Sequence, residues 1–255
     1  MNVLRFTLLL ALLVLGGCAA ENTRRGVDGG DAANAAYTRL GIEYLQAGDL
    51  QGAKKAFQKS LAIAPDDAEA HNGLALAFQL EGEPALAEQY FRKATRLAPQ
   101  SAMIHNNLGA FLFAAQRYEE ACEELAQATQ DPFYNRRSQA FENLGRCYSH
   151  LNQSAAAKHA FERALQISPN RVISMIELAD LELKAGQVGN AEFYFERFAE
   201  LVERRRVEHY AKSLWVGIRI ARERGQTSQA ATYALLLKNL FPDSPEYKLY
   251  EESAR

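Results

Sequence analysis

The stretch from residue 37 to residue 65, YTRLGIEYLQAGDLQGAKKAFQKSLAIAP, decides the fold because its pattern recurs along the chain. It ends at Pro65, the next such proline is Pro99, 34 residues later, and the residues in between repeat the same order of aromatic, small and apolar side chains. A fixed period of this length indicates stacked repeats that each touch only their neighbours.

The side chains at fixed positions resemble the tetratricopeptide repeat, whose motif is W-x2-L-G-x2-Y, then A-x3-F-x2-A, then P. The first copy matches this motif at Tyr37, Leu40, Gly41, Tyr44, Ala53, Phe57, Ser60 and Pro65. Later copies begin at His71, His105 and Phe141, whereas the fifth and sixth keep little beyond Leu178, Ala179, Ala191, Phe195, Ala230, Leu237 and Pro242. The resemblance implies an all-α solenoid of about six helix-turn-helix repeats over residues 34–255, wound into a right-handed superhelix.

A turn residue recurs at one register between the two helices of each repeat. Glycine or asparagine, the residues that accept a left-handed helix end, occupies this register in five of the six repeats: Gly48, Gly82, Asn152, Gly186 and Gly225. Gln116 is the exception.

The N-terminus carries an apolar run from Phe6 to Leu15, with Arg5 before it. About ten residues are too few to span a bilayer, and the arrangement is typical of a cleaved signal peptide, here residues 1–17. The last residues of this segment and Cys18 read LGGC, which resembles the bacterial lipobox. The resemblance implies that Cys18 is acylated, palmitate being among the chains, and that it anchors the protein through a flexible tether over residues 18–33. Ala19 rather than Asp follows the cysteine, which implies the periplasmic face of the outer membrane.

The composition argues against several classes of function. The formal net charge is −2 and the sequence pI is about 6.2, so the chain has no basic surface for nucleic acid. It contains no HExxH, GxSxG, GxxxxGK[ST], GxGxxG or CxxC motif. We therefore expect no enzyme activity, no cofactor and no metal, and we interpret His71 and His105 as packing residues at the position of the motif tryptophan. We expect a monomer.

Two further cysteines, Cys122 and Cys147, lie on helices that the repeat pattern makes neighbours. In an oxidising compartment they can form a disulfide, but they can equally be small core residues. The sequence leaves both alternatives open.

Without catalytic motifs, function should lie on the surface lined by the first helices of the repeats. The positions between the packing residues predict a partner-binding groove, apolar with interspersed amides: Thr38, Ile42, Leu45, Asn72, Leu76, Gln79, Asn106, Ala110 and Phe113. Each apolar member can instead pack under its own repeat. No preceding helix covers Tyr37, Leu40 and Tyr44, which we expect to form an exposed contact surface. The corresponding positions of the later repeats are charged or mixed: Glu142, Arg146, Asp180, Lys184, Trp215 and Arg219.

A join of two extra residues between the third and fourth repeats carries a more specific resemblance. Together with the lipobox, the tether and six repeats, Pro132, Tyr134 and the run Glu142 to Gly145 resemble the type IV pilus assembly lipoproteins of the PilF/PilW family. That resemblance implies a pilotin, which binds the pilus secretin subunit and promotes its localisation and multimerisation in the outer membrane. The alternative is an outer-membrane adaptor that docks a periplasmic peptidase or peptidoglycan hydrolase.

Overall fold

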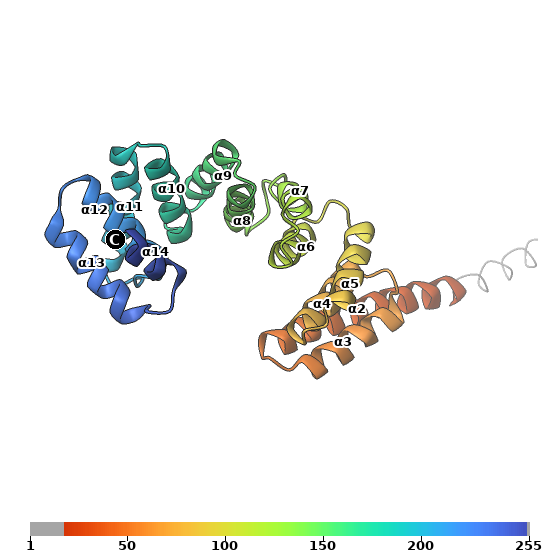
Figure 1. The fold of residues 1–255 in the computed structure, drawn as a ribbon. Coiled ribbons are helices and arrows are strands. Elements are labelled where there is room, and N and C mark those ends of the chain that lie inside the picture. Colours follow the sequence, from red (N-terminus) through yellow and green to blue (C-terminus); the bar gives the residue numbers. More distant parts are fainter. Residues whose placement is uncertain (1–17, 254–255) are drawn as a thin grey trace, which may run out of the picture. The chain divides into compact units, whose positions relative to one another are not determined.

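The computed structural model describes residues 18–253, and side chains from residue 30 onward. This part of the chain contains thirteen helices and no strand: α2 Cys18–Gln46, α3 Leu50–Ile63, α4 Ala68–Leu80, α5 Pro84–Leu97, α6 Ala102–Ala114, α7 Tyr118–Ala128, α8 Arg137–His150, α9 Ser154–Ile167, α10 Val172–Lys184, α11 Val188–Glu203, α12 Ala211–Glu223, α13 Thr227–Leu240 and α14 Pro245–Ser253 (Figure 1). The predicted signal peptide lies outside the described residues.

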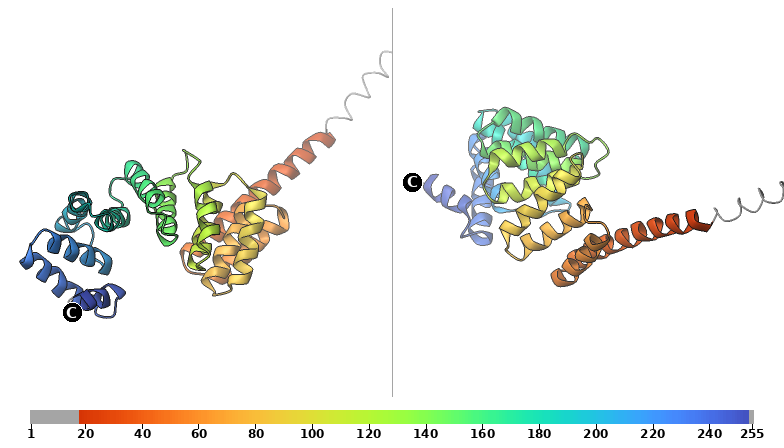
Figure 2. Two further views of the ribbon diagram at one scale, coloured as in Figure 1. Left: turned by 45° about the horizontal axis from the view of Figure 1, so that its top comes forward. Right: turned by 90° about the vertical axis from the view of Figure 1, so that its right-hand side faces the viewer.

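The helices form two compact units, and the boundary between Phe111 and Leu112 falls inside α6. In the first unit, α2 packs on α3 and α4 packs on α5, while α4 also contacts α2 and α3. In the second unit the pairs are α8 with α9, α10 with α11 and α12 with α13, and α14 packs on α12 and α13 (Figure 2). Consecutive antiparallel pairs are the arrangement of tetratricopeptide repeats, so the predicted all-α fold is confirmed.

Proline and left-handed residues set the helix ends. Helices α3, α5, α9 and α13 each end two residues before a proline, because the residue preceding proline disfavours helical backbone. All six turn positions have positive φ, including Gln116 at 60° and Asn152 at 57°. The turn prediction is therefore confirmed, and Gln116 adopts the same conformation as the glycines.

A buried phenylalanine on the second helix of a repeat packs against a glycine on the first helix. The ring of Phe57 is fully buried, and a Cβ added at Gly41 or Gly73 would lie 2.5 or 2.2 Å from its nearest ring atom. At Gly145 in the second unit the corresponding distance to the Phe161 ring is 2.7 Å. These glycines are needed because the ring occupies the space of a side chain.

The expected flexible tether over residues 18–33 requires a correction, because α2 begins at Cys18 and continues without a break for 29 residues. Its C-terminal half packs on α3 and α4, which provides a formed helix from which further turns can grow at small cost. Six alanines between residues 19 and 36 favour that growth. The three glycines that suggested flexibility do not interrupt the helix, and its first turns project beyond the rest of the first unit (Figures 1 and 2).

None of the helices in the described part of the chain combines the length and the apolar character needed to cross a membrane.

Candidate partner-binding pockets

The first unit contains a pocket of about 650 Å³ between α2 and the turn that joins α3 to α4. We call it the first-repeat pocket, and its lining residues are Asn34, Ala35, Thr38, Arg39, Ile42, Ala64, Pro65, Asp66, Asp67 and Glu69. It contains two members of the predicted groove, Thr38 and Ile42, together with a turn that the groove prediction did not include. The signal for that turn was Pro65, which ends the repeat.

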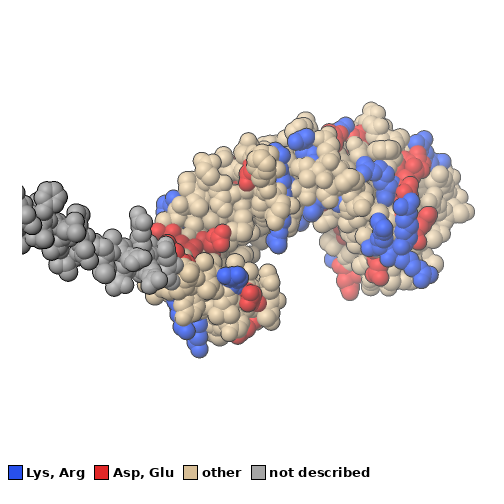
Figure 3. All heavy atoms as spheres, turned by 180° about the vertical axis from the view of Figure 1, so that it is seen from behind, with Lys and Arg blue, Asp and Glu red and all other residues tan. Residues whose placement is uncertain are grey.

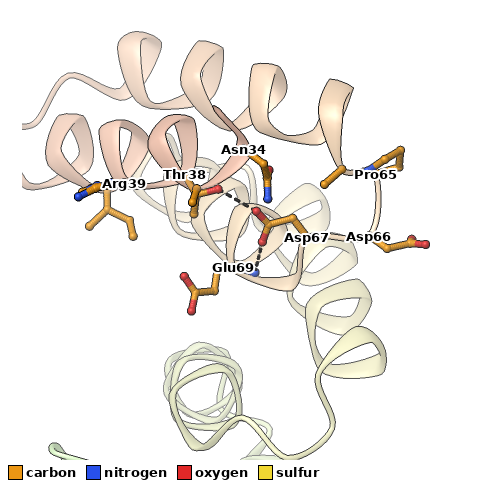
Figure 4. Close-up of a pocket in the computed structure, with 10 residues that line it drawn as sticks. Asn34, Thr38, Arg39, Pro65, Asp66, Asp67 and Glu69 are labelled. Carbon is orange, nitrogen blue, oxygen red and sulfur yellow. Dashed lines mark hydrogen bonds between the residues drawn. The ribbon is translucent and has the colours of Figure 1, made fainter. Parts of the chain in front are cut away.

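The floor of the first-repeat pocket is a closed polar network. The Thr38 hydroxyl donates to Asp67 Oδ2 at 2.8 Å (Figure 4). The Ser60 hydroxyl lies 3.0 Å from the same oxygen. Asp67 also caps α4, since its Oδ1 accepts hydrogen bonds from the backbone N–H groups of Glu69 and Ala70. Burial raises the pKa of the Asp67 carboxyl, but the Ala70 N–H and the two hydroxyls outweigh it and hold that pKa below its usual value.

The rim and wall of this pocket remain available to a ligand. Figure 4 shows the Arg39 and Glu69 side chains pointing away from the network, and Asp66 also points outward, where it forms an ion pair with Lys93 at 3.0 Å. Ile42 leaves 38% of its surface exposed beside Ala35 and Pro65. The arrangement can therefore accept an apolar side chain against Ile42, with charged groups at the edge.

Three polar residues of the predicted groove are buried, and two of them link neighbouring repeats. Thr38, Asn72 and Asn106 share one register and are only 4–6% exposed. Thr38 bonds Asp67 of the next repeat, and Asn72 Oδ1 accepts a hydrogen bond from Asn107 Nδ2 at 3.1 Å. We reassign Thr38 and Asn72 to the contact between repeats, and the low exposure of all three side chains leaves little surface for a ligand backbone.

The remaining groove residues divide by exposure. Gln79 and Ala110 are exposed, Leu45 and Leu76 are half-buried, and Phe113 is half-buried in the second unit. Leu45 packs against the core cluster around Phe57, so it supports the fold.

The predicted contact surface on the first repeat is smaller than expected. Leu40 is 36% exposed, whereas Tyr37 is half-buried with the Lys59 ammonium 5.3 Å from its ring centre. Tyr44 packs against the core cluster around Phe57 and is not an exposed residue. The correction follows from α3, which covers the side of α2 that carries Tyr44.

The two histidines at the same register, His71 and His105, link consecutive repeats. Nε2 of His71 lies 2.9 Å from the carbonyl oxygen of Pro65, and Nε2 of His105 lies 3.0 Å from that of Pro99. Each ring therefore ties the start of one repeat to the proline that ends the preceding one.

Cys122 on α7 and Cys147 on α8 form a disulfide, with their Cα atoms 5.6 Å apart. This separation is typical of a protein disulfide. The bond joins the third repeat to the fourth within the second unit.

The second unit has a pocket of different character, which we call the charged pocket. It has a volume of about 320 Å³ and is lined by Arg146, Ser149, His150, Asn152, Ser154, Glu177, Asp180, Leu181, Lys184 and Lys212. Arg146, Asp180 and Lys184 were among the charged positions noted in the sequence. Lys212 was not among the predicted positions, because it lies at the start of α12, before Trp215 and Arg219.

Ion pairs hold the helices around the charged pocket together. Asp180 Oδ1 accepts from Arg219 at 2.6 Å, its Oδ2 lies 2.9 Å from the Lys184 ammonium, and Glu177 pairs with Lys212 at 2.6 Å. Burial raises the pKa of Asp180, but the Lys184 hydrogen bond and the charges of Lys212, Lys184 and Arg219 hold it below its usual value. Figure 3 shows charged side chains of both signs gathered in the second unit.

Comparison with known proteins agrees with the fold. Tetratricopeptide-repeat family models match residues 38–102 and 100–170. The solved structure described as a functional characterisation of Pseudomonas aeruginosa pilF superposes with a TM-score of 0.80 at 40% identity, and it covers 88% of this chain and 99% of that one. A crystal structure of PilW, described as a widely conserved type IV pilus biogenesis factor, gives a TM-score of 0.71 at 29% identity over 85% of this chain and 97% of that one.

The sequence relationship is equally extensive. The chain is 38% identical over 248 residues to the type IV pilus assembly protein PilF of Pseudomonas aeruginosa, and the alignment covers 95% of this chain and 96% of that protein. Identity at this level over nearly the whole length includes both units and the insertion between the third and fourth repeats. The chain therefore belongs to the PilF family of tetratricopeptide-repeat proteins of type IV pilus biogenesis.

Proposed function

We propose that this protein is an outer-membrane lipoprotein that binds the type IV pilus secretin subunit and promotes its localisation and multimerisation. The observation that carries the proposal is the 38% identity to PilF over 95% of the chain. The fold is a protein-interaction fold, and we propose that the protein acts by binding and has no catalytic activity of its own.

The N-terminal sequence supports an anchored protein. The LGGC run ending at Cys18 is a lipobox by resemblance, and two or more acyl chains give stable membrane attachment where one chain does not. In this proposal the lipid delivers the protein, with its bound secretin subunit, to the outer membrane.

The first-repeat pocket is the proposed contact for the secretin subunit. Its wall offers Ile42 and Ala35 to an apolar side chain, and Leu40 leaves 36% of its surface exposed on the same helix. The polar floor is already satisfied by Thr38 and Asp67, so a partner gains affinity by covering apolar surface.

The primary test measures heat-resistant secretin multimers in outer membranes of cells with and without the gene. We expect the multimer to disappear and unassembled subunits to accumulate in the inner membrane when the gene is absent. Cys18→Ala should leave a folded protein that mislocalises the secretin. An unchanged multimer in the deletion strain would overturn the proposal, and copurification of a peptidase or peptidoglycan hydrolase would then favour the adaptor alternative.

A matched pair of variants tests the pocket. Ile42→Glu places a charge against the apolar wall and should weaken secretin binding about tenfold or more. Leu86→Glu on α5 is the control, since Leu86 is 39% exposed, almost the same as Ile42, but does not line the pocket. Equal binding by the two variants in a pull-down, with unchanged circular dichroism, would contradict the assignment of this pocket.

A further inference from the structure

Arg146 lines the charged pocket, and no carboxylate in the described part of the chain pairs with it. Among the described residues, no carboxylate lies within ion-pairing distance of the exposed Arg146, whose guanidinium carbon lies 5.1 Å from the centre of the Phe113 ring. Phe113 in turn packs edge-on to His150, which lines the pocket. Stacking of this kind restrains the guanidinium while leaving its N–H donors available.

The surrounding ion pairs leave an excess of positive charge. Arg146, Lys184 and Lys212 line the pocket, and Arg219 reaches Asp180 from α12. The carboxylates that face these four cations are Glu177 and Asp180, so two positive charges remain. Lys184 is 65% exposed and shares Asp180 with two other cations, so it can bind a further anion with little loss.

Ser149 also lines this pocket, but its Oγ atom is inaccessible to solvent, so a ligand in the pocket does not reach the hydroxyl. The donors that a ligand meets are therefore the cationic groups.

We infer that the charged pocket binds a carboxylate carried by an acidic segment of a partner protein. Arg146 supplies the planar donor pair that suits a carboxylate, and Lys184 adds charge. Glu177 and Asp180 stand beside these donors and can accept N–H groups from the same segment, which favours a polypeptide over a phosphate polymer. The volume of about 320 Å³ suits one or two side chains.

This inference does not rest on the identity of the partner at the first-repeat pocket. All lining residues of the charged pocket belong to the second unit, and none belongs to the predicted groove. A failure of secretin binding would therefore leave this site untouched.

The test uses fluorescein-labelled degenerate heptapeptides with Glu or Gln fixed at the centre and neutral residues elsewhere, blocked at both ends. Binding to the full chain is followed by fluorescence anisotropy at low and high salt. We expect the Glu library to bind at least tenfold more tightly than the Gln library, with weakening by salt. A Gln library with a free C-terminal carboxyl distinguishes a terminal carboxylate from an acidic side chain.

Two charge-matched double variants decide where binding occurs. Arg146→Gln with Lys184→Gln should reduce affinity for the Glu library about tenfold, because both cations belong to the pocket. Lys55→Gln with Lys238→Gln removes the same net charge from exposed residues outside the pocket and should leave affinity unchanged. Equal effects of the two double variants, measurable but equal binding of the two blocked libraries, or binding of none of the three libraries would overturn the inference.

Discussion

Thr38 in the first unit and Glu142 in the second occupy the same register of the repeat, yet they join neighbouring repeats by different chemistry. Thr38 uses a neutral hydroxyl, which donates to the carboxylate that caps α4. Glu142 is itself a buried carboxylate, which accepts from Arg171 and from the backbone N–H and hydroxyl of Ser174. One register can therefore carry either a neutral or a charged link without a change of fold.

This difference extends to the two pockets. The first-repeat pocket lies over a satisfied network and presents Ile42, whereas the charged pocket is built from ion pairs with cations in excess. Apolar contact favours affinity, and charged contact favours selection among partners. The proposed function and the further inference therefore assign different partner segments to the two units.

The largest expected effect comes from breaking the charged link. Glu142→Ala leaves Arg171 and Ser174 without their partner, and loss of one member of a buried pair costs about 3 kcal/mol or more. We expect the free energy of opening in α8 to α10, measured by hydrogen exchange with mass spectrometry, to fall by this amount. Glu123→Ala, at an exposed position of α7, is the control and should change it by less than about 0.5 kcal/mol.

The next effect tests how tightly each unit is packed. Gly41→Ala should destabilise the first unit by about 2 kcal/mol, because Phe57 is enclosed by glycines of α2 and α4 and cannot move away. Gly145→Ala should cost the second unit about 1 kcal/mol, since the added Cβ is less close to the Phe161 ring. Addition of Phe57→Leu to Gly41→Ala should recover part of the loss in urea unfolding. No recovery would show that the ring is not the obstacle.

Acid should weaken both units, but salt should distinguish them. The pKa values of Asp67 and Asp180 are below the usual value in the folded protein. Each carboxylate therefore contributes stability above its unfolded pKa of about 3.9, and this contribution is lost as the pH falls through the folded pKa.

The two sites differ in what surrounds the carboxylate. Asp67 is held by hydroxyls and N–H groups, so its contribution should resist 0.5 M salt, whereas the exposed ammonium groups around Asp180 should make its contribution smaller in salt. Asp67→Asn and Asp180→Asn should each remove the pH dependence that the carboxylate gives to the free energy of local opening, measured by hydrogen exchange from pH 3 to 6. The same salt dependence at both sites would contradict the contrast between the units.

The sequence was sufficient to predict the fold, because the 34-residue period, the prolines and the turn residues act locally within each repeat. It was not sufficient for the groove. Whether Thr38 and Asn72 face solvent depends on side chains of the following repeat, and no pattern within one repeat shows that contact. Lys212 likewise lies at the start of α12, outside the register from which the groove positions were taken. The helix through residues 18–33 depends on packing of the later part of α2 against α3 and α4, which comes from outside this segment.

The smallest expected effect concerns the turn at Gln116, where the second unit uses a residue that the first unit avoids. A non-glycine residue at positive φ, such as Gln116, costs the folded protein about 1 kcal/mol. Glycine removes this strain, but its greater conformational freedom in the unfolded chain offsets about half of the gain. Gln116→Gly should therefore stabilise the α6–α7 turn by about 0.5 kcal/mol, whereas Gly82→Ala, at φ 78° in the first unit, should destabilise its own turn by about 1 kcal/mol. Urea unfolding curves should show a gain in stability for Gln116→Gly and a loss for Gly82→Ala. That result would mean that the repeat determines the turn conformation, whereas the residue at the turn determines its energetic cost. A loss of stability in Gln116→Gly would instead mean that the glutamine side chain makes a contact that outweighs the backbone strain.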